Sequence, residues 1–253
     1  MWQSWGVYEL FDRFAERYDL HTPPDHYRHD HAFVLATAAA FGTRCRLLDV
    51  GCGTGVLLEK ALRAGLIANG IDASEGMVSV ARSRVGERGV AVRRMQEIDE
   101  EGAYDLVVAL SWTLNYSADQ DELRDVLGCM HRALRPGGRV LLQVAHAMNV
   151  DGLQMEDREP GPSGVADDVV FTYRFVCLNP EGSQMRAEYG YSCRSTDERL
   201  RENHLLHVTD VHAVVRCARE VGFGEVEIYD SWRRDPFQRS ASPFVSGAKG
   251  REP

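Results

Sequence analysis

The chain has 253 residues, of which 44% are hydrophobic and 26% charged, so it can bury a core and is not globally disordered. It has no apolar run long enough to cross a bilayer, and its first residues lack the basic and apolar stretches of a secretory signal, so we expect a cytoplasmic location. The net charge of −9 comes from dispersed acids, which argues against nucleic-acid and membrane partners because both need clustered cations. The six cysteines contain no C-x-x-C pair and are interpreted as reduced thiols, not as disulfides or a zinc site.

The first 20 residues carry aromatic side chains at helical spacing: Tyr8, Phe11, Phe14 and Tyr18. This spacing predicts a helical segment, which the proline pair at positions 23 and 24 interrupts. Asp25 is expected to cap a second helix that runs to about Phe41 and ends at Gly42.

From Arg46 onward, short apolar segments alternate with helical patterns. The predicted strands are Leu47–Val50, a segment ending at Asp72, Val90–Arg93, Asp105–Leu110 and Arg139–Ala145. The predicted helices are Val56–Ala64, a segment beginning at Ser74, and Asp119–Leu134, which the turn at 135–138 closes. This alternation predicts a parallel sheet covered by helices on both faces.

The alternation breaks at His146. Residues 146–168 are rich in glycine, proline and acids and are expected to form a loop. Antiparallel strands are predicted next at Val169–Leu178, Gln184–Arg194 and Asn203–Val208. A helix (Asp210–Val221) and two strands (Glu225–Tyr229 and Pro243–Ala248) then complete the first pattern. We therefore predict one α/β domain over residues 1–253, with an N-terminal lid at 1–30 and a β-rich, substrate-side insertion at 146–209.

A glycine-rich loop, Asp49-Val50-Gly51-Cys52-Gly53-Thr54-Gly55, lies between the first strand and its helix. Glycines there let the backbone pass close to a ligand, and the start of the helix offers free N–H groups. A second acid, Asp72, ends the next strand, where an acid can accept hydrogen bonds from ribose hydroxyls. The loop and this acid together predict a nucleoside ligand, and Cys52 is interpreted as a small filler residue.

The details of the loop narrow the ligand class. Val56 stands where a dinucleotide fingerprint needs its third glycine, which opposes a nicotinamide oxidoreductase, and the Gly-Lys-Ser/Thr of a phosphate-binding loop is missing. Asp49, placed before the loop, would repel a pyrophosphate and attract a cation. A sulfonium that carries an α-amino group and a ribose fits these residues.

Several motifs follow one another in a familiar order: Leu48–Gly55, Asp72–Met77, Tyr104–Val108 and Leu134–Gly138. They resemble the motifs of the class I S-adenosylmethionine-dependent methyltransferases, and the resemblance covers roughly residues 45–145. It implies a Rossmann-like, seven-stranded, mostly parallel sheet whose last strand is antiparallel. It also implies S-adenosyl-L-methionine as the cofactor and S-adenosyl-L-homocysteine as the product.

The resemblance further implies a set of cofactor-binding residues: Tyr27, Asp49, Gly51, Gly53, Gly55, Asp72, Met77, Gln96 and Leu110. The family often has an acid after the third strand to hold the adenine amine. Here Met95-Gln96 stands in that place, so Gln96 would make this hydrogen bond.

The segment Phe14–Asp19, the later Tyr27 and the β-rich insertion resemble one subgroup of the family. This subgroup contains macrolide aminosugar N,N-dimethyltransferases, lincosamide N-methyltransferases and glycine N-methyltransferase. The resemblance implies that Tyr18 lies near the transferring methyl group and that Tyr116 faces the substrate amine. Further substrate contacts are expected from Tyr8, Phe11, Trp112 and Asn115. The acceptor would be an aminosugar-like or lincosamide-like small molecule of bacterial secondary metabolism.

Alternatives remain open at this stage. An oxygen acceptor needs a general base, and His146 at the end of the fifth strand is the best-placed histidine, although its position favours an ordinary rim histidine over a base. Tyr8 and Phe11 could instead pack into the core. A non-catalytic adenosylmethionine-binding protein also fits the motifs, and homo-oligomerisation is left open.

No metal site is expected. His26 would share a helix face with His29 or Asp30, but no ligand motif supports a metal there. His204 and His207 are three apart on a predicted strand, so they face opposite sides and cannot chelate together.

Overall fold

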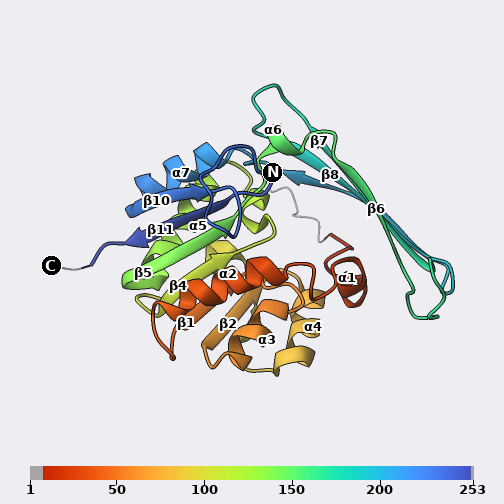
Figure 1. Cartoon of the computed structure of the whole chain (residues 1–253), viewed down its shortest axis with the longest axis horizontal. Helices are drawn as coiled ribbons and strands as arrows, with labels where there is room; N and C mark the ends of the chain where they lie inside the picture. Colours follow the sequence, from red (N-terminus) through yellow and green to blue (C-terminus); the bar gives the residue numbers. More distant parts are fainter. Residues whose placement is uncertain (1–7, 252–253) are drawn as a thin grey trace.

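The computed structural model describes residues 8–251, apart from the side chain of His21, so the first seven residues of the predicted lid lie outside it. Its main sheet has seven strands in the order β10-β11-β5-β4-β1-β2-β3 (Figure 1). These are β1 (Arg46–Val50), β2 (Ile67–Asp72), β3 (Val90–Val92), β4 (Tyr104–Ala109), β5 (Leu134–Gln143), β10 (Phe223–Tyr229) and β11 (Phe244–Lys249). β1 to β5 are parallel and β11 is antiparallel to both neighbours, which confirms the predicted Rossmann-like sheet.

Helices cover both faces of this sheet (Figure 1). They are α2 (Arg28–Ala39), α3 (Val56–Arg63), α4 (Glu75–Val85), α5 (Gln120–Ala133) and α7 (Val211–Glu220). Several begin with a side-chain cap: Ser74 accepts from the Met77 amide, and Asp119 from that of Glu122. β5 begins earlier than predicted, because Leu134 already pairs with Tyr104 before the glycine turn and regular pairing resumes at Arg139.

The core lies in two layers, one on each face of the sheet. Leu47 packs with residues of α2 and α3, whereas its neighbour Leu48 packs with residues of α5 and α7. Successive strand side chains point to opposite faces, so a sheet buried on both sides needs an unbroken apolar run. β4 meets this need, since all six of its residues are buried.

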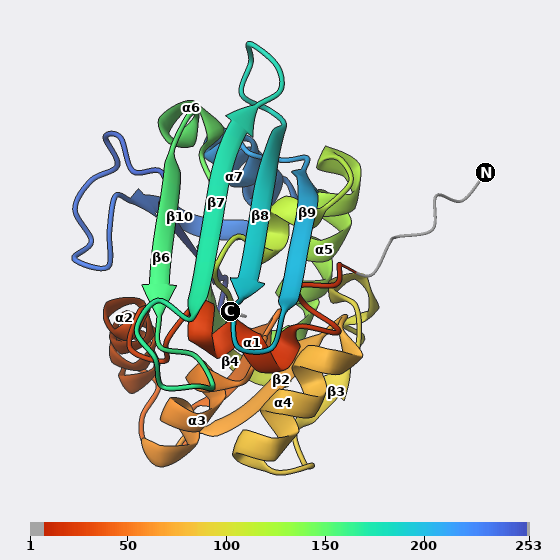
Figure 2. The same ribbon diagram turned by 90° about the vertical axis from the view of Figure 1, so that its right-hand side faces the viewer.

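After β5, the chain forms the short helix α6 (Ala147–Val150) and a second, antiparallel sheet in the order β6-β7-β8-β9 (Figure 2). Its strands are β6 (Gln154–Glu159), β7 (Val169–Cys177), β8 (Met185–Cys193) and β9 (Glu198–Leu206). The prediction of a loop over 146–168 was therefore wrong at α6 and β6. The polar sequence of β6 has no apolar alternation, and it is extended because it pairs along its whole length with β7. Pairing with β8 likewise starts β9 five residues before the predicted Asn203.

The N-terminal segment is less regular than predicted. Among residues 8–27, residues 9–14 form turns and only α1 (Ala15–His21) is an α-helix. Asp25 does not cap the second helix, because residues 23–28 form turns and α2 starts after Tyr27. α1 lies beside α4 and near β6, where the inserted sheet approaches the α/β body (Figure 2). Within residues 8–251, no helix is long and apolar enough to cross a membrane.

Candidate active site

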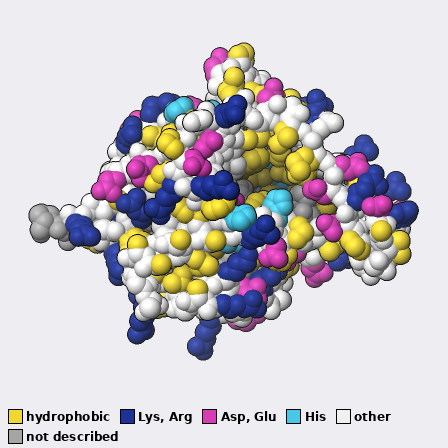
Figure 3. Space-filling view, viewed as in Figure 1, with side chains coloured by type: hydrophobic (Ala, Val, Ile, Leu, Met, Phe, Trp, Pro, Cys, Tyr) yellow, Lys and Arg dark blue, Asp and Glu magenta, His cyan; other side chains and the backbone are white. Residues whose placement is uncertain are grey.

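A cavity of about 470 Å³ lies over the carboxyl ends of β1, β2 and β4, under the N-terminal segment. Open α/β sheets bind ligands at this edge, where the ends of parallel strands meet. In the space-filling view, a hollow edged by hydrophobic side chains is visible where the α/β body meets the inserted sheet (Figure 3). The cavity thus borders the main sheet, the N-terminal segment and the loop after β4.

The glycine loop forms the floor of the cavity. Gly51 has a φ of +73°, and a Cβ there would lie 2.3 Å from Oγ1 of Thr113, so both conformation and space require glycine. Gly53 has a φ of +53°, and a Cβ there would meet no protein atom within 4 Å. The loop therefore leaves room for a ligand directly against its backbone.

Two acids at the strand ends set the charge of this floor. Burial, reinforced by nearby Asp72, raises the pKa of Asp49 to about 7. Asp72 accepts hydrogen bonds from the amides of Gly53 (3.0 Å) and Ser74 (2.9 Å), yet burial still raises its pKa. A ligand that brings a positive charge and hydroxyl donors would favour the ionised form of both groups, so the floor suits a cationic nucleoside.

Further along, the cavity wall contains an apolar side chain, Met77, and a side-chain amide, Gln96. Met77 is buried in the wall, and Gln96 lies in a 3₁₀ turn, η1 (Met95–Glu97). The Gln96 side-chain amide donates to a carboxylate oxygen of Glu122 at 2.7 Å. Because a carboxylate only accepts, this bond assigns the NH₂ group to Glu122 and leaves the Gln96 oxygen as an acceptor. That oxygen could accept from the exocyclic amine of an adenine.

The N-terminal segment covers the cavity and is tied to the α/β body at several points. The Ser74 hydroxyl donates to the Phe11 carbonyl (2.5 Å), and the Gly76 amide donates to Asp12 (3.1 Å). Asp19 accepts from the Thr54 hydroxyl at 2.6 Å, and it also forms an ion pair with Arg84 of α4. On the other side, Arg17 bonds to Glu198 of β9 at 3.3 Å. The segment thus bridges the α/β body and the inserted sheet.

Under this cover, aromatic rings line one end of the cavity: Tyr8, Phe11, Tyr18 and Tyr116. The ring centroid of Phe11 lies 6.1 Å from that of Tyr18 and 6.0 Å from that of Tyr116. Burial raises the pKa of both tyrosines well above the usual 10, so both phenols are neutral at physiological pH. We call these four rings the aromatic cluster; its electron-rich faces can attract a cation.

The loop after β4 brings Tyr116 into this cluster. Ser111 and Trp112 both have left-handed φ values, +49° and +67°, which turn the chain sharply into the 3₁₀ helix η2 (Thr113–Tyr116). The Ser111 amide donates to the side chain of Gln143 (3.0 Å). Ser111 also hydrogen-bonds the side chain of Tyr27, which lines the cavity together with Leu110.

Trp112 and Asn115, expected to contact the substrate, do not line the cavity. The Trp112 indole N–H donates to the Ser242 hydroxyl (2.9 Å), and its ring packs on Phe175. Asn115 is fully buried; its amide donates to the Val208 carbonyl (2.5 Å). Both side chains join η2 to neighbouring segments, so their role in the fold is structural.

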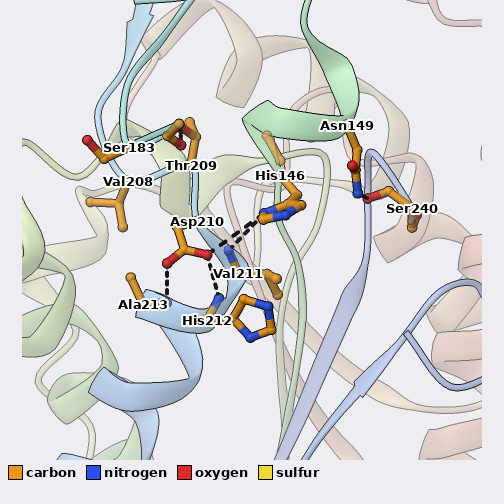
Figure 4. A network of polar contacts seen from close by, with 12 residues as sticks. His146, Asn149, Ser183, Val208, Thr209, Asp210, Val211, His212, Ala213 and Ser240 are labelled. Atoms are coloured by element: carbon orange, nitrogen blue, oxygen red, sulfur yellow. Dashed lines mark hydrogen bonds and ion pairs between the residues drawn. The ribbon is translucent and has the colours of Figure 1, made fainter. Parts of the chain in front are cut away.

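His146 also lies away from the cavity, against the start of α7 (Figure 4). Its Nδ1 accepts from the Val211 amide at 3.4 Å and lies 3.9 Å from a carboxylate oxygen of Asp210. Asp210 in turn accepts from the amides of His212 and Ala213, which caps α7. Burial lowers the pKa of His146. The structure therefore does not bring His146 to a place where it could deprotonate a substrate in the cavity.

The histidines near α2 have other partners. His29 stacks on Trp232, and Nδ1 of His31 lies 3.1 Å from the Lys60 ammonium. Asp30 accepts from the Gln143 amide at 3.0 Å. Over the described part of the chain, no group of three or more His, Cys, Asp or Glu side chains could hold a metal ion.

Two residues beside the aromatic cluster were missed by the sequence analysis. His204 is fully buried behind Tyr116, and Glu202 contacts its far side. In the sequence, His204 is three residues from His207, a spacing that places the two on opposite faces of a strand. The informative spacing is the one between Glu202 and His204, because residues two apart on a strand share a face.

Comparison with known proteins agrees with these motifs. Residues 47–138 match the family model described as a methyltransferase domain. The chain is 36% identical over 103 residues to a ubiquinone biosynthesis O-methyltransferase of Pseudomonas aeruginosa, covering 38% of this chain and 43% of the relative. It is 33% identical over 97 residues to a dTDP-4-amino-2,3,4,6-tetradeoxy-D-glucose N,N-dimethyltransferase of Saccharopolyspora spinosa, covering 38% and 39%. Even the longest of the leading matches spans only 60% of the relative's length.

The fold has solved counterparts over nearly its whole length. The sugar N-methyltransferase KedS8 from Streptoalloteichus superposes with a TM-score of 0.77 at 20% identity, covering 100% of this chain and 97% of that one. At this identity, the likeness shows the fold alone. Residues 47–138 are therefore similar to a methyltransferase domain, and they lie in a fold that solved S-adenosylmethionine-dependent methyltransferases share.

Proposed function

We propose that this protein transfers a methyl group from S-adenosylmethionine to an amine nitrogen of a small molecule, aminosugar-like or lincosamide-like. The observation that carries the proposal is the single cavity that joins the acids Asp49 and Asp72 to the aromatic cluster. Its two ends suit a cationic nucleoside and a small apolar amine, respectively. The aminosugar N,N-dimethyltransferase among the relatives and the sugar N-methyltransferase fold support the same acceptor class.

At the cofactor end, the geometry supports each proposed contact. Asp49 balances the positive charge, Asp72 accepts from the ribose hydroxyls, and the Gln96 oxygen accepts from the adenine amine. Gly51, Gly53 and Gly55 let the backbone approach the ligand, while Met77, Leu110 and Tyr27 line the walls. When bound, S-adenosylmethionine supplies a methyl group already activated on a sulfonium. The protein therefore mainly aligns the acceptor and excludes water.

At the acceptor end, we assign the alignment to Tyr18 and Tyr116. Both are neutral phenols that line the cavity, and Tyr8 and Phe11 complete the enclosure. Aromatic faces attract a cationic amine, and the amine loses its proton before it attacks. In this proposal the protein acts as one domain, in which residues 1–30 form a lid and residues 146–209 shape the acceptor side. The similar N-methyltransferases support N-methylation, and antibiotic biosynthesis as its setting is part of the same proposal.

A hydroxyl acceptor is the second candidate, favoured by the likeness to ubiquinone biosynthesis O-methyltransferases. That likeness lies in a stretch of 103 residues, less than half of either chain, and His146 lies outside the cavity. An oxygen acceptor would therefore need a base other than His146.

The test is an assay with methyl-labelled S-adenosylmethionine and matched acceptor pairs, in which each aminosugar or lincosamide-like amine is paired with its hydroxyl analogue. We expect label on the amine of at least one pair and none on the hydroxyl partner. Label on hydroxyls alone would replace the proposal by the second candidate. Calorimetric titration with S-adenosylhomocysteine and with NADH is the binding control, and tighter binding of NADH would reject both.

A further inference from the structure

His204 is buried behind the aromatic cluster with a partner on each ring nitrogen. The Tyr116 hydroxyl lies 2.8 Å from Nδ1, and a carboxylate oxygen of Glu202 lies 3.0 Å from Nε2. His204 has no exposed surface, and Tyr116 has its ring in the cavity wall. The three side chains therefore form a continuous chain of hydrogen bonds from the cavity into the inserted sheet.

The Glu202 carboxylate at one end of this chain determines where the protons lie. A carboxylate can only accept, so the hydrogen lies on Nε2 of His204 and is donated to Glu202. Burial lowers the pKa of His204, so the ring is neutral and Nδ1 accepts from the Tyr116 hydroxyl. Tyr116 thus donates its single hydroxyl hydrogen to His204. Its oxygen can then only accept further hydrogen bonds, and a substrate N–H is a suitable donor.

The surroundings of His204 favour this arrangement. The titratable groups that face it are Tyr8, Tyr116 and Tyr189 from three separate elements and Glu202 from its own strand. Glu202 also accepts from the amides of Glu9 (2.8 Å) and Leu10 (3.0 Å), which fixes its carboxylate. Glu202 is therefore the group that can stabilise a positive charge on His204. The N-terminal segment therefore helps to hold the carboxylate at the end of this chain.

We infer that Glu202 and His204 are positioning residues that make Tyr116 the proton acceptor for the incoming amine. The inference rests on the proposed function. An aliphatic amine is mostly an ammonium at neutral pH and has no lone pair with which to attack. In the inferred step, an ammonium N–H bond breaks and its proton bonds to the Tyr116 oxygen, while the hydrogen of Tyr116 passes to Nδ1 of His204.

The balance of this step is complete. The N–H electron pair stays on nitrogen as the attacking lone pair, and no group is oxidised or reduced. His204 becomes an imidazolium held by the Glu202 carboxylate, in the manner of a base oriented by a buried acid. After the product leaves, Nδ1 returns its proton to the Tyr116 oxygen, and Tyr116 gives the proton taken from the amine to water that enters the cavity, so the starting arrangement is restored.

The main test is the pH profile of Glu202→Gln with an amine acceptor. The amides of Glu9 and Leu10 bond to different oxygens of the carboxylate, so the single glutamine oxygen keeps one of these bonds, and the neutral side chain cannot hold an imidazolium. We expect kcat at pH 7 to fall by about tenfold to a hundredfold, and the defect to shrink to less than about threefold at pH 9.5, where the amine arrives already deprotonated. Tyr116→Phe, which keeps the ring, should show the same pH-dependent defect.

The matched control is Glu198→Gln. Glu198 is on the same strand and holds the same N-terminal segment through Arg17, but its hydrogen bonds go to other groups than His204. We expect any loss in this variant to be equal at every pH. A loss in Glu202→Gln that is likewise independent of pH would overturn the inference, since it would show a purely structural role.

A second measurement does not depend on turnover. Nitrogen-15 NMR of labelled histidine should show neutral His204 with its proton on Nε2, and Glu202→Gln should lower the pKa of His204. A proton on Nδ1 would overturn the inference even if the enzyme methylates amines. If the NMR result holds but no amine is methylated, the proposed function fails and not the hydrogen-bond chain.

Discussion

At the cofactor end of the cavity, Asp49, Gly53 and Asp72 come from one short stretch of chain, whereas at the acceptor end Tyr8, Tyr116 and His204 come from widely separated segments. The cofactor end is a strand–loop–helix unit whose conformation is fixed locally by glycines and by the start of a helix. The acceptor end exists only after the N-terminal segment has packed against the inserted sheet. The two ends should therefore respond differently to substitution: the first in cofactor affinity, the second in turnover.

Deletion of residues 1–20 should have the largest effect, because it removes the N-terminal segment that the acceptor end needs and the cofactor end does not. Leu10 and Phe14 pack against Phe171 and Tyr191 of the inserted sheet, so the deletion exposes that face but leaves both layers of the main core intact. We expect a folded protein with a lower Tm and at least about a hundredfold less activity, since water is no longer excluded from the acceptor. Circular dichroism and turnover check this, and normal turnover of the deletion variant would contradict the assignment of the lid.

Tyr18→Phe tests the acceptor end with a smaller change. The substitution keeps the ring and removes the hydroxyl, so an aligning role predicts a fall in kcat of roughly tenfold to a hundredfold. The dissociation constant of the cofactor should change much less.

The stability of two variants separates this role from core packing. If Tyr18 were only a core residue, Tyr18→Phe would be silent in rate, and Tyr18→Ala would act through a lower Tm. Rate and thermal stability of both variants therefore decide between the two roles. A silent Tyr18→Phe beside an unstable Tyr18→Ala would remove Tyr18 from the site.

The same contrast explains which parts of the site could be predicted from sequence. Asp49, the glycines and Asp72 lie at strand ends in a motif of fixed spacing, so their shared position follows from the order of strands and helices alone. Tyr116, Trp112 and Asn115 share one loop, but only the folded backbone, with left-handed Ser111 and Trp112, decides which of them faces the cavity. A predicted strand end therefore indicates where a residue lies, but not which way its side chain points.

His146 and His204 show the same limit of sequence-based prediction: His146 was expected in the site and lies outside it, whereas His204 was not expected and lies beside the aromatic cluster. His146 follows β5 at the edge where substrates bind, yet its ring turns toward Asp210 and α7. His204 lies in the inserted sheet, far from any motif, and reaches the aromatic cluster through contacts across 88 residues of sequence. Long-range packing of this kind leaves no local pattern, so β6 and the N-terminal turns also escaped prediction.

Asp72→Ala sharpens the comparison at the cofactor end. Asp72 would accept from the ribose, and a hydrogen bond to a charged group contributes roughly 1.5–3 kcal/mol, so the dissociation constant of the cofactor should rise by about tenfold or more. At saturating cofactor, kcat should change far less than it does in Tyr18→Phe. Calorimetric titration gives the affinity, and an unchanged value would remove Asp72 from the site.

The pH dependence of cofactor binding is the finest test, and it depends on Asp49. Its pKa is raised to about 7 by burial, so the carboxylate is about half protonated at neutral pH in the free protein. A cationic ligand needs the ionised form, so affinity should fall by several-fold, and at most about tenfold, between pH 8 and pH 6. Asp49→Asn should bind more weakly and lose this part of the slope, while any slope from the ligand's own amino group remains in both proteins.

The same shift predicts the stability of the free protein. Because the pKa of Asp49 is higher when folded than its ordinary 3.8, its contribution to stability is fully present below about pH 4 and is lost as the pH rises through about 7. Asparagine cannot ionise, so Asp49→Asn should raise the Tm of the cofactor-free protein by several °C at pH 8 and by much less at pH 5. Thermal melts at both pH values check the sign. Equal Tm changes at the two pH values would mean that ionisation of Asp49 does not destabilise the cofactor-free protein. The buried carboxylate would then not need a cation to compensate its charge.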